Sequence, residues 1–244
     1  MDIPQKLRLF ESSLYTETPI VYESEGSGVL DRTRLEELGV WLAGQVEQSR
    51  LHAGVFESVL LPAILYGEGV RTGFQYTPET TIIEGVDRMR ARHKAFLCVV
   101  EPLAKAVGAN YRFEMQPEKR GEDYSGKLGI VAGESLPEDS EKRGEFLRYP
   151  SCCVDNFVSG ERPEGPYQSN FDGQTLEEVE GFLEENPDLH YQLFRACGED
   201  CEEAAVQRRE YRDLVVSNYP GIAERFEPLL RRDFIADIAE YRRE

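Results

Sequence analysis

The sequence has little lysine, histidine or tryptophan and a large deficit of positive charge. Its 244 residues include six lysines and three histidines, and 46 acidic side chains leave a net charge of −18. A protein with this charge repels phosphate backbones and anionic lipid head groups. We therefore expect no non-specific binding to nucleic acid and no binding to membrane surfaces.

The sequence also lacks a hydrophobic run long enough to span a membrane. The most hydrophobic stretch, residues 55–66, is short and contains Glu57 and Pro62. The first residues have no apolar core of a secretion signal. We expect a cytoplasmic protein in a reducing compartment, where clustered cysteines indicate metal or redox chemistry more often than a disulfide framework.

Short motifs of several enzyme classes are absent from the sequence. It contains no Gly-x-Ser-x-Gly nucleophile elbow, no Walker lysine and no His-Glu-x-x-His zinc motif. Gly26-Ser27-Gly28 lacks the third glycine of a dinucleotide-binding fingerprint. Hydrolase, nucleotidase and zinc-protease activities therefore have no motif in their favour, and we predict no cofactor-binding loop.

The basic residues that are present are mostly arginine, 22 of 28. Many carboxylates with few lysines suit a high-salt, halophilic cytosol, and a codon bias toward arginine is the alternative. Residues 205–244 contain eight arginines and eight acidic residues, so the whole net negative charge belongs to residues 1–204. We expect the C-terminal arginines to face the acidic body or an anionic partner.

The strand-forming segments predict a small antiparallel hairpin or sheet in the N-terminal and middle part. Residues 20–22 have the pattern of a short strand, and residues 111–115 and 127–132 those of a hairpin whose loop is residues 116–126. Residues 55–65 fit either a buried strand or a buried helix, because periodicity alone does not separate the two.

Most of the chain has helical periodicity, which predicts an α+β fold that is predominantly helical, with a helical C-terminal part. The expected helices span residues 31–50, 78–107, 175–186, 202–218 and 222–241, and another begins near residue 188. The division we expect is an α+β part over 1–133 and a helical part over 134–244, or a single domain.

Five cysteines are the chemically informative residues. Cys152 and Cys153 follow Pro150-Ser151, a helix-start signal that places both in a first turn, where the helix dipole favours a thiolate. Cys197 and Cys201 are four residues apart, and on a continuous helix they would share one face with His190. Cys98 stands in an apolar helical segment and is predicted to be a core residue.

These residue types at these spacings are typical of a zinc or iron–sulfur site. We predict the metal ligands from this set: Cys152, Cys153, Cys197, Cys201 and His190. Adjacent helical residues point about 100° apart, so a site with only one of the vicinal cysteines is geometrically easier. A disulfide or redox pair and inert core thiols are the alternatives.

The cysteine elements also resemble a known family. Residues 149–157, Tyr-Pro-Ser-Cys-Cys-Val-Asp-Asn-Phe, and residues 197–201, Cys-Gly-Glu-Asp-Cys, are similar to elements of the mainly archaeal domain-of-unknown-function family numbered 483. The resemblance extends over residues 140–205. Arg148 and Ala196 depart from it, because the family has glycine and proline there. It implies an archaeal source and four cysteines that act as one unit, and it implies no reaction.

Three functions follow from these observations. The first is a metal or cluster site that ties residues around 152 to the C-terminal helices. The second is an acidic interaction or scaffold protein with inert core thiols and a protein partner. The third is a thiol-dependent enzyme with Cys152 or Cys153 as nucleophile and His190 as base.

Overall fold

A computed structural model describes most of the chain and divides it into two compact units. The described residues are 5, 8, 20–48, 51–76, 98–120, 123–133, 137, 139–160, 171–193, 196–198 and 201–243. One unit takes residues 1–31 and 66–136, and the other takes 32–65 and 137–244. A compact unit need not fold independently, so the division into folding domains at 133/134 stays a prediction.

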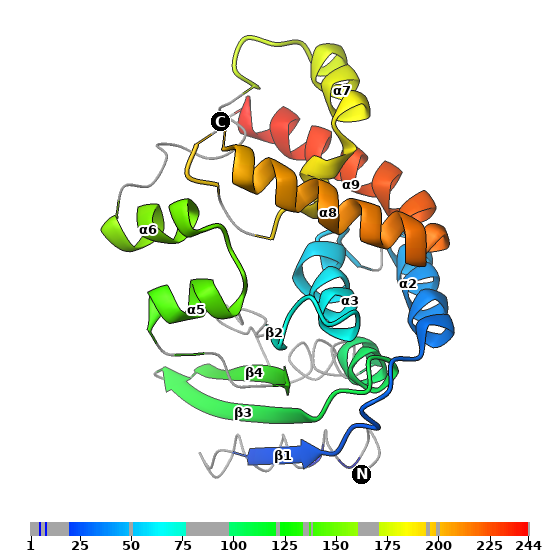
Figure 1. Cartoon of the computed structure of the whole chain (residues 1–244), viewed down its shortest axis with the longest axis vertical. Helices are drawn as coiled ribbons and strands as arrows, with labels where there is room; N and C mark the ends of the chain where they lie inside the picture. Colours follow the sequence, from blue (N-terminus) through cyan, green and yellow to red (C-terminus); the bar gives the residue numbers. More distant parts are fainter. Residues whose placement is uncertain are drawn as a thin grey trace. The chain divides into compact units, whose positions relative to one another are not determined.

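The first unit contains an antiparallel sheet with the strand order β1-β3-β4-β2 (Figure 1). Its strands are β1 (Ile20–Ser24), β2 (Gly73–Tyr76), β3 (Tyr111–Arg120) and β4 (Asp123–Gly133). In its register, Tyr22 pairs with Phe113, and Phe113 pairs with Ile130. The small antiparallel sheet is confirmed.

The β3–β4 hairpin is longer than the sequence pattern indicates. The predicted loop at 116–126 is wrong over most of its length, because Gln116 pairs with Lys127 and the ladder continues to Arg120 and Asp123. Polar residues do not alternate with apolar ones there, so the pattern gives no strand signal. Cross-strand backbone hydrogen bonds nevertheless extend the hairpin to its tip.

A helical segment over residues 98–106 belongs to the same unit. Val100 and Leu103 on it are buried, and the hydroxyl of Tyr111 donates to Oε1 of Glu101 at 3.0 Å. Cys98 is partly buried at the start of this segment. The remainder of the helix predicted over 78–107 lies outside the described residues.

The second unit is helical, which confirms the predicted helical C-terminal part and a predominantly helical α+β fold. The elements in or entering it are α2 (Arg32–Glu47), the π-helical turn η1 (Phe56–Leu60), α3 (Leu61–Gly67), α5 (Ser140–Phe146), α6 (Ser151–Ser159), α7 (Leu176–Glu185), the 3₁₀ turn η3 (Pro187–Tyr191), α8 (Glu202–Asn218) and α9 (Pro220–Tyr241). The run at 55–65 is therefore helical.

Local sequence signals explain where several of these helices begin and end. Thr175 caps α7 in a reciprocal box: its Oγ1 accepts the N–H of Glu178 at 3.2 Å, and the Glu178 carboxylate accepts the N–H of Thr175 at 2.6 Å. The helix ends at Glu185, just before Pro187. The predicted bounds of α8 match the structure, and α9 begins two residues earlier than predicted.

The core of this unit forms where α2, η1, η3, α8 and α9 pack together. The ring of Phe56 lies between those of Phe226 and Tyr191, with centroid distances of 5.1 and 5.3 Å. All three side chains are fully buried. Arg212 and the hydroxyl of Tyr191 both donate to Oε1 of Glu227, at 2.8 and 3.1 Å, which fixes α8 and η3 against α9.

Arginines of α8 and α9 pair with acidic residues from earlier in the chain. Arg208 contacts Asp188 at 3.3 Å, Arg225 contacts Glu47 at 3.3 Å, and Arg231 contacts Glu184 at 2.7 Å. These three arginines therefore face acidic groups of residues 1–204, as the charge distribution predicts. The second unit thus combines an apolar core with ion pairs around it.

Candidate metal centre

Helix α6 begins where the sequence predicts and places two cysteines in its first turn. Pro150 precedes the helix with a φ of −53°, and its carbonyl accepts the N–H groups of Cys153 and Val154 at 2.9 and 3.0 Å. Proline suits this position because its fixed φ is close to helical and no intrahelical bond is lost. Cys152 and Cys153 are the second and third residues of the helix.

A tight turn between α5 and α6 orients this helix start. Arg148 has a φ of 56°, the left-handed conformation that glycine adopts more readily, which explains physically why glycine would suit this position. Its carbonyl accepts a hydrogen bond from Nε2 of Gln207 on α8, and the hydroxyl of Tyr149 donates to the carbonyl of Leu193 at 3.1 Å. These two bonds direct the α6 N-terminus toward the residues that precede α8.

Cys197 and Cys201 reach the same place without sharing a helix. Cys197 lies in an irregular segment after η3, and Cys201 is the N-cap of α8. The continuous helix that would put His190 on one face with both cysteines is not formed, because η3 ends at Tyr191 and Cys197 lies in a non-helical segment. The backbone N–H of Cys197 donates instead to Sγ of Cys153 at 3.4 Å.

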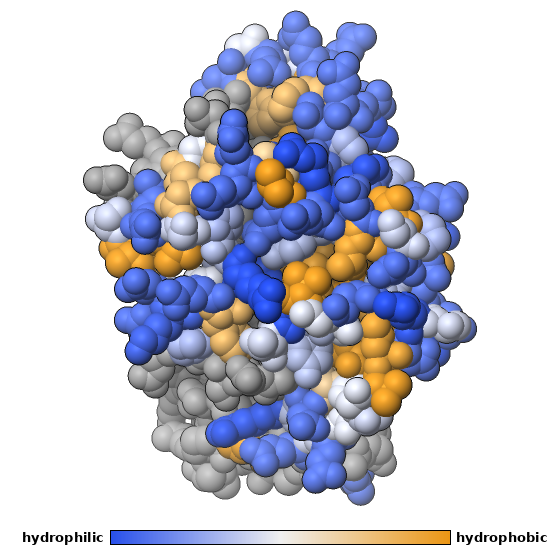
Figure 2. Space-filling model, viewed as in Figure 1, coloured by the Kyte–Doolittle hydropathy of each residue, from blue (hydrophilic) through white to orange (hydrophobic). Residues whose placement is uncertain are grey.

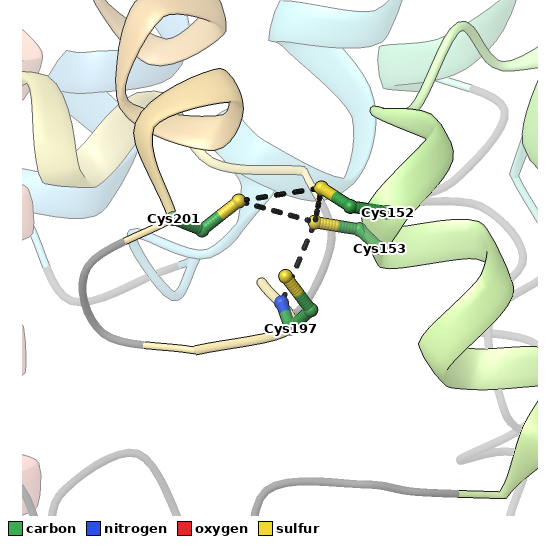
Figure 3. Close-up of side chains that lie close together, drawn as sticks. All are labelled: Cys152, Cys153, Cys197 and Cys201. Atoms are coloured by element: carbon green, nitrogen blue, oxygen red, sulfur yellow. Dashed lines mark hydrogen bonds between the residues drawn. The ribbon is translucent and has the colours of Figure 1, made fainter.

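The four sulfur atoms form one compact group (Figure 3). Sγ of Cys201 lies 3.6 Å from Sγ of Cys152 and 3.7 Å from Sγ of Cys153, and the two vicinal sulfurs are 3.9 Å apart. With Sγ of Cys197 included, all four lie within 4.8 Å of one another. Both vicinal thiols thus contribute, although a site with only one of them was the geometrically easier expectation.

The surroundings of the group suit negative charge. Helices α6 and α8 both begin at the four cysteines, so the positive ends of two helix dipoles lie beside the sulfur atoms. Burial raises the pKa of the Cys201 thiol, but the N–H of Ala204 and the neighbouring thiols outweigh this and lower it below its usual value. Burial raises the pKa of Cys153 to about 12. Without a cation, the group therefore favours a thiolate at Cys201 first.

His190 is not part of this group. Its side chain is only 4% exposed, and its ring packs edge-on against that of Phe234 with a centroid distance of 6.3 Å. Burial, with Arg231 nearby, lowers its pKa to about 4. The structure therefore gives His190 the surroundings of a neutral core histidine and does not bring it to the cysteines. Cys98 lies outside the group as well.

Glu203 is the residue at this site that sequence reasoning did not select. Its Oε2 lies 3.7 Å from Sγ of Cys152. Acidic residues are expected in the first turn of any helix, so nothing distinguished Glu203 from Glu202 beside it. Only its proximity to Cys201 in the sequence could have indicated it.

The four thiols lie close enough together to serve as one set of ligands. Cys153 is buried and the other three cysteines are partly exposed, which is unusual for thiols that serve only as apolar packing. No family model, curated protein or solved structure matches this chain. Within the described ranges, no helix combines the length and apolar character that crossing a bilayer requires. The four cysteines could hold a metal ion.

Proposed function

We propose that Cys152, Cys153, Cys197 and Cys201 bind one metal ion in tetrahedral geometry, and that zinc is the metal. The sulfur spacing is the observation that carries this proposal. A Zn–S distance of about 2.3 Å in a regular tetrahedron places the sulfurs about 3.8 Å apart. The three sulfur pairs among Cys152, Cys153 and Cys201 lie between 3.6 and 3.9 Å.

The same spacing argues for a single ion rather than an iron–sulfur cluster. In a four-iron cluster each cysteine binds a different iron, so the ligand sulfurs lie farther apart than four sulfurs on one ion. Here all four lie within 4.8 Å of one another. A set of four protein thiolates leaves no open coordination position, which is typical of structural zinc.

Helices α5 and α6 pack against each other, and we call residues 140–159 the α5–α6 hairpin. The proposed role of the metal is to link this helical hairpin to the start of α8. Cys152 and Cys153 lie on α6, Cys201 is the N-cap of α8, and Cys197 lies in the irregular segment that precedes it. A metal that binds only the folded arrangement contributes its binding free energy to folding. A relationship to family 483 stays a prediction, and the proposal does not depend on it.

Metal analysis of the purified chain tests the proposal. We expect one zinc per chain, and after exchange with cobalt we expect the absorption of a tetrahedral tetrathiolate site. Cys201→Ser should lose most of the metal, whereas Cys98→Ser should keep it and serves as the matched control. Iron in place of zinc would overturn the choice of metal and leave the four-cysteine site standing. Equal metal in both variants, or none in the wild type, would overturn the proposed centre.

A further inference from the structure

The four sulfurs of the proposed centre differ in their access to solvent and in their neighbours. Cys153 is buried, and its sulfur accepts the N–H of Cys197. Cys201 has the N–H of Ala204 beside its sulfur. Such N–H groups stabilise charge on a thiolate and reduce its tendency to attack.

Cys152 has the opposite surroundings. Its side chain is partly exposed, and its non-thiol neighbour is the carboxylate of Glu203 at 3.7 Å. Among the described residues no backbone N–H is found donating to its sulfur. The negative carboxylate repels the negative charge of a Cys152 thiolate. This repulsion is relieved when the sulfur forms a new bond and loses its charge, so the carboxylate makes the thiolate more reactive.

We propose that Cys152 is the site at which hydrogen peroxide oxidises the centre, an inference that rests on the proposed metal site. The Cys152 thiolate takes one peroxide oxygen as the O–O bond breaks, which forms a sulfenic acid and releases hydroxide. The Cys201 thiolate then attacks the Cys152 sulfur, forms an S–S bond and displaces a second hydroxide. The two sulfurs lose two electrons, the peroxide gains two, and solvent protons convert both hydroxides to water.

Geometry selects Cys201 as the partner. Its sulfur lies 3.6 Å from that of Cys152, whereas the sulfur of Cys153 lies 3.9 Å away. Cys153 is a poor partner because Cα atoms of adjacent residues are about 3.8 Å apart, below the range of about 4.4–6.8 Å for disulfides. Once Cys152 and Cys201 are joined, only two thiolates remain for the metal, so the oxidised chain releases it.

Peroxide treatment of the zinc-loaded full chain tests this inference. We expect zinc release, followed with a chromogenic chelator, to accompany a Cys152–Cys201 disulfide mapped by mass spectrometry after free thiols are blocked. A thiol reductant with added zinc should restore the metal. A different first disulfide, or zinc retained under excess peroxide, would overturn the inference and leave the metal site standing. A chain that never holds zinc would overturn both.

A charge variant tests the part played by Glu203 while all four sulfurs are kept. Glu203→Gln should bind zinc as the wild type does and release it under peroxide up to about fivefold more slowly, the effect of removing one charge about 4 Å away in water. Glu202→Gln removes the same charge from the adjacent exposed residue and should release zinc at the wild-type rate. Equal rates in the two variants would contradict the role of Glu203.

Discussion

The α8–α9 core and the α5–α6 hairpin belong to the same unit but differ in how many apolar side chains they bury. Phe226 and Ile222 of α9 are fully buried, and each such side chain contributes about 1.5–3 kcal/mol. Helix α6 buries only Cys153 and Val154. Phe157 and Val158 of the same helix are each 52% exposed, and apolar side chains show at the left edge of Figure 2, where Figure 1 draws α6.

This difference indicates where a metal would matter. The core has buried rings and the Arg212–Glu227 ion pair, so it has stabilising contacts of its own. The α5–α6 hairpin contacts α8 and the segment before it through two hydrogen bonds, from Tyr149 to Leu193 and from Gln207 to Arg148, and through the four cysteines. A segment with little buried apolar area needs a cross-link to stay in place. We therefore expect metal-dependent order in α5–α6 and metal-independent order in α9.

Removal of the metal should have the largest effect and should separate the two regions. Structural zinc contributes on the order of 10 kcal/mol to the structures that form it. With a strong chelator, amides of α6 should exchange hydrogen rapidly while those of α9 stay protected, measured by hydrogen exchange and mass spectrometry. Equal changes in both helices would contradict the comparison.

A cavity in the core should destabilise the unit without removing the metal ligands. Phe226→Ala deletes a fully buried ring, which costs about 3–5 kcal/mol in the free energy of unfolding. Urea titration measures the loss, and zinc per folded chain should stay unchanged. Phe157→Ala on α6 is the matched control and should cost clearly less, because that ring is 52% exposed and its loss removes less buried apolar area.

The protonation of His190 tests whether this residue belongs to the core or to the metal site. Its pKa of about 4 in the folded chain lies below the ordinary 6.5, so folding favours the neutral ring. Stability from this residue is complete above pH 6.5 and is lost as the pH falls toward 4, by about 3 kcal/mol in total.

Comparison of the wild type with His190→Gln isolates that contribution, because other groups titrate in both proteins. The difference in their free energies of unfolding should shrink by this amount between pH 6.5 and 4. His190→Gln should keep its zinc. Loss of zinc in this variant would identify His190 as a ligand after all.

The smallest effect is expected at the cap of α7. Thr175→Ala removes the Oγ1 that accepts the N–H of Glu178, which costs about 1 kcal/mol. Thr175→Ser keeps the acceptor and should stay close to the wild type in thermal unfolding. Neither variant should alter zinc content, and a change in zinc would mean that α7 and the metal site are coupled.

Much of the helical organisation could be predicted from local signals. The capping box at Thr175, the helix start at Pro150-Ser151 and the bounds of α8 each depend on neighbours in the sequence. The four-cysteine set was also predicted. The inclusion of His190 rested on a continuous helix through residue 197, which the structure does not have. The helical spacing of His190 from the cysteines could not by itself distinguish a metal ligand from a core residue.

Helix starts and the set of available thiols can be predicted from the residues alone, because caps, prolines and apolar periodicity act over a few residues. Which side chains meet depends on long-range packing. Cys153 and Cys197 are 44 residues apart, and Arg148 and Gln207 are 59 apart. Their proximity depends on the left-handed turn before α6 and on the packing of α8 against the core, and no local pattern specifies either.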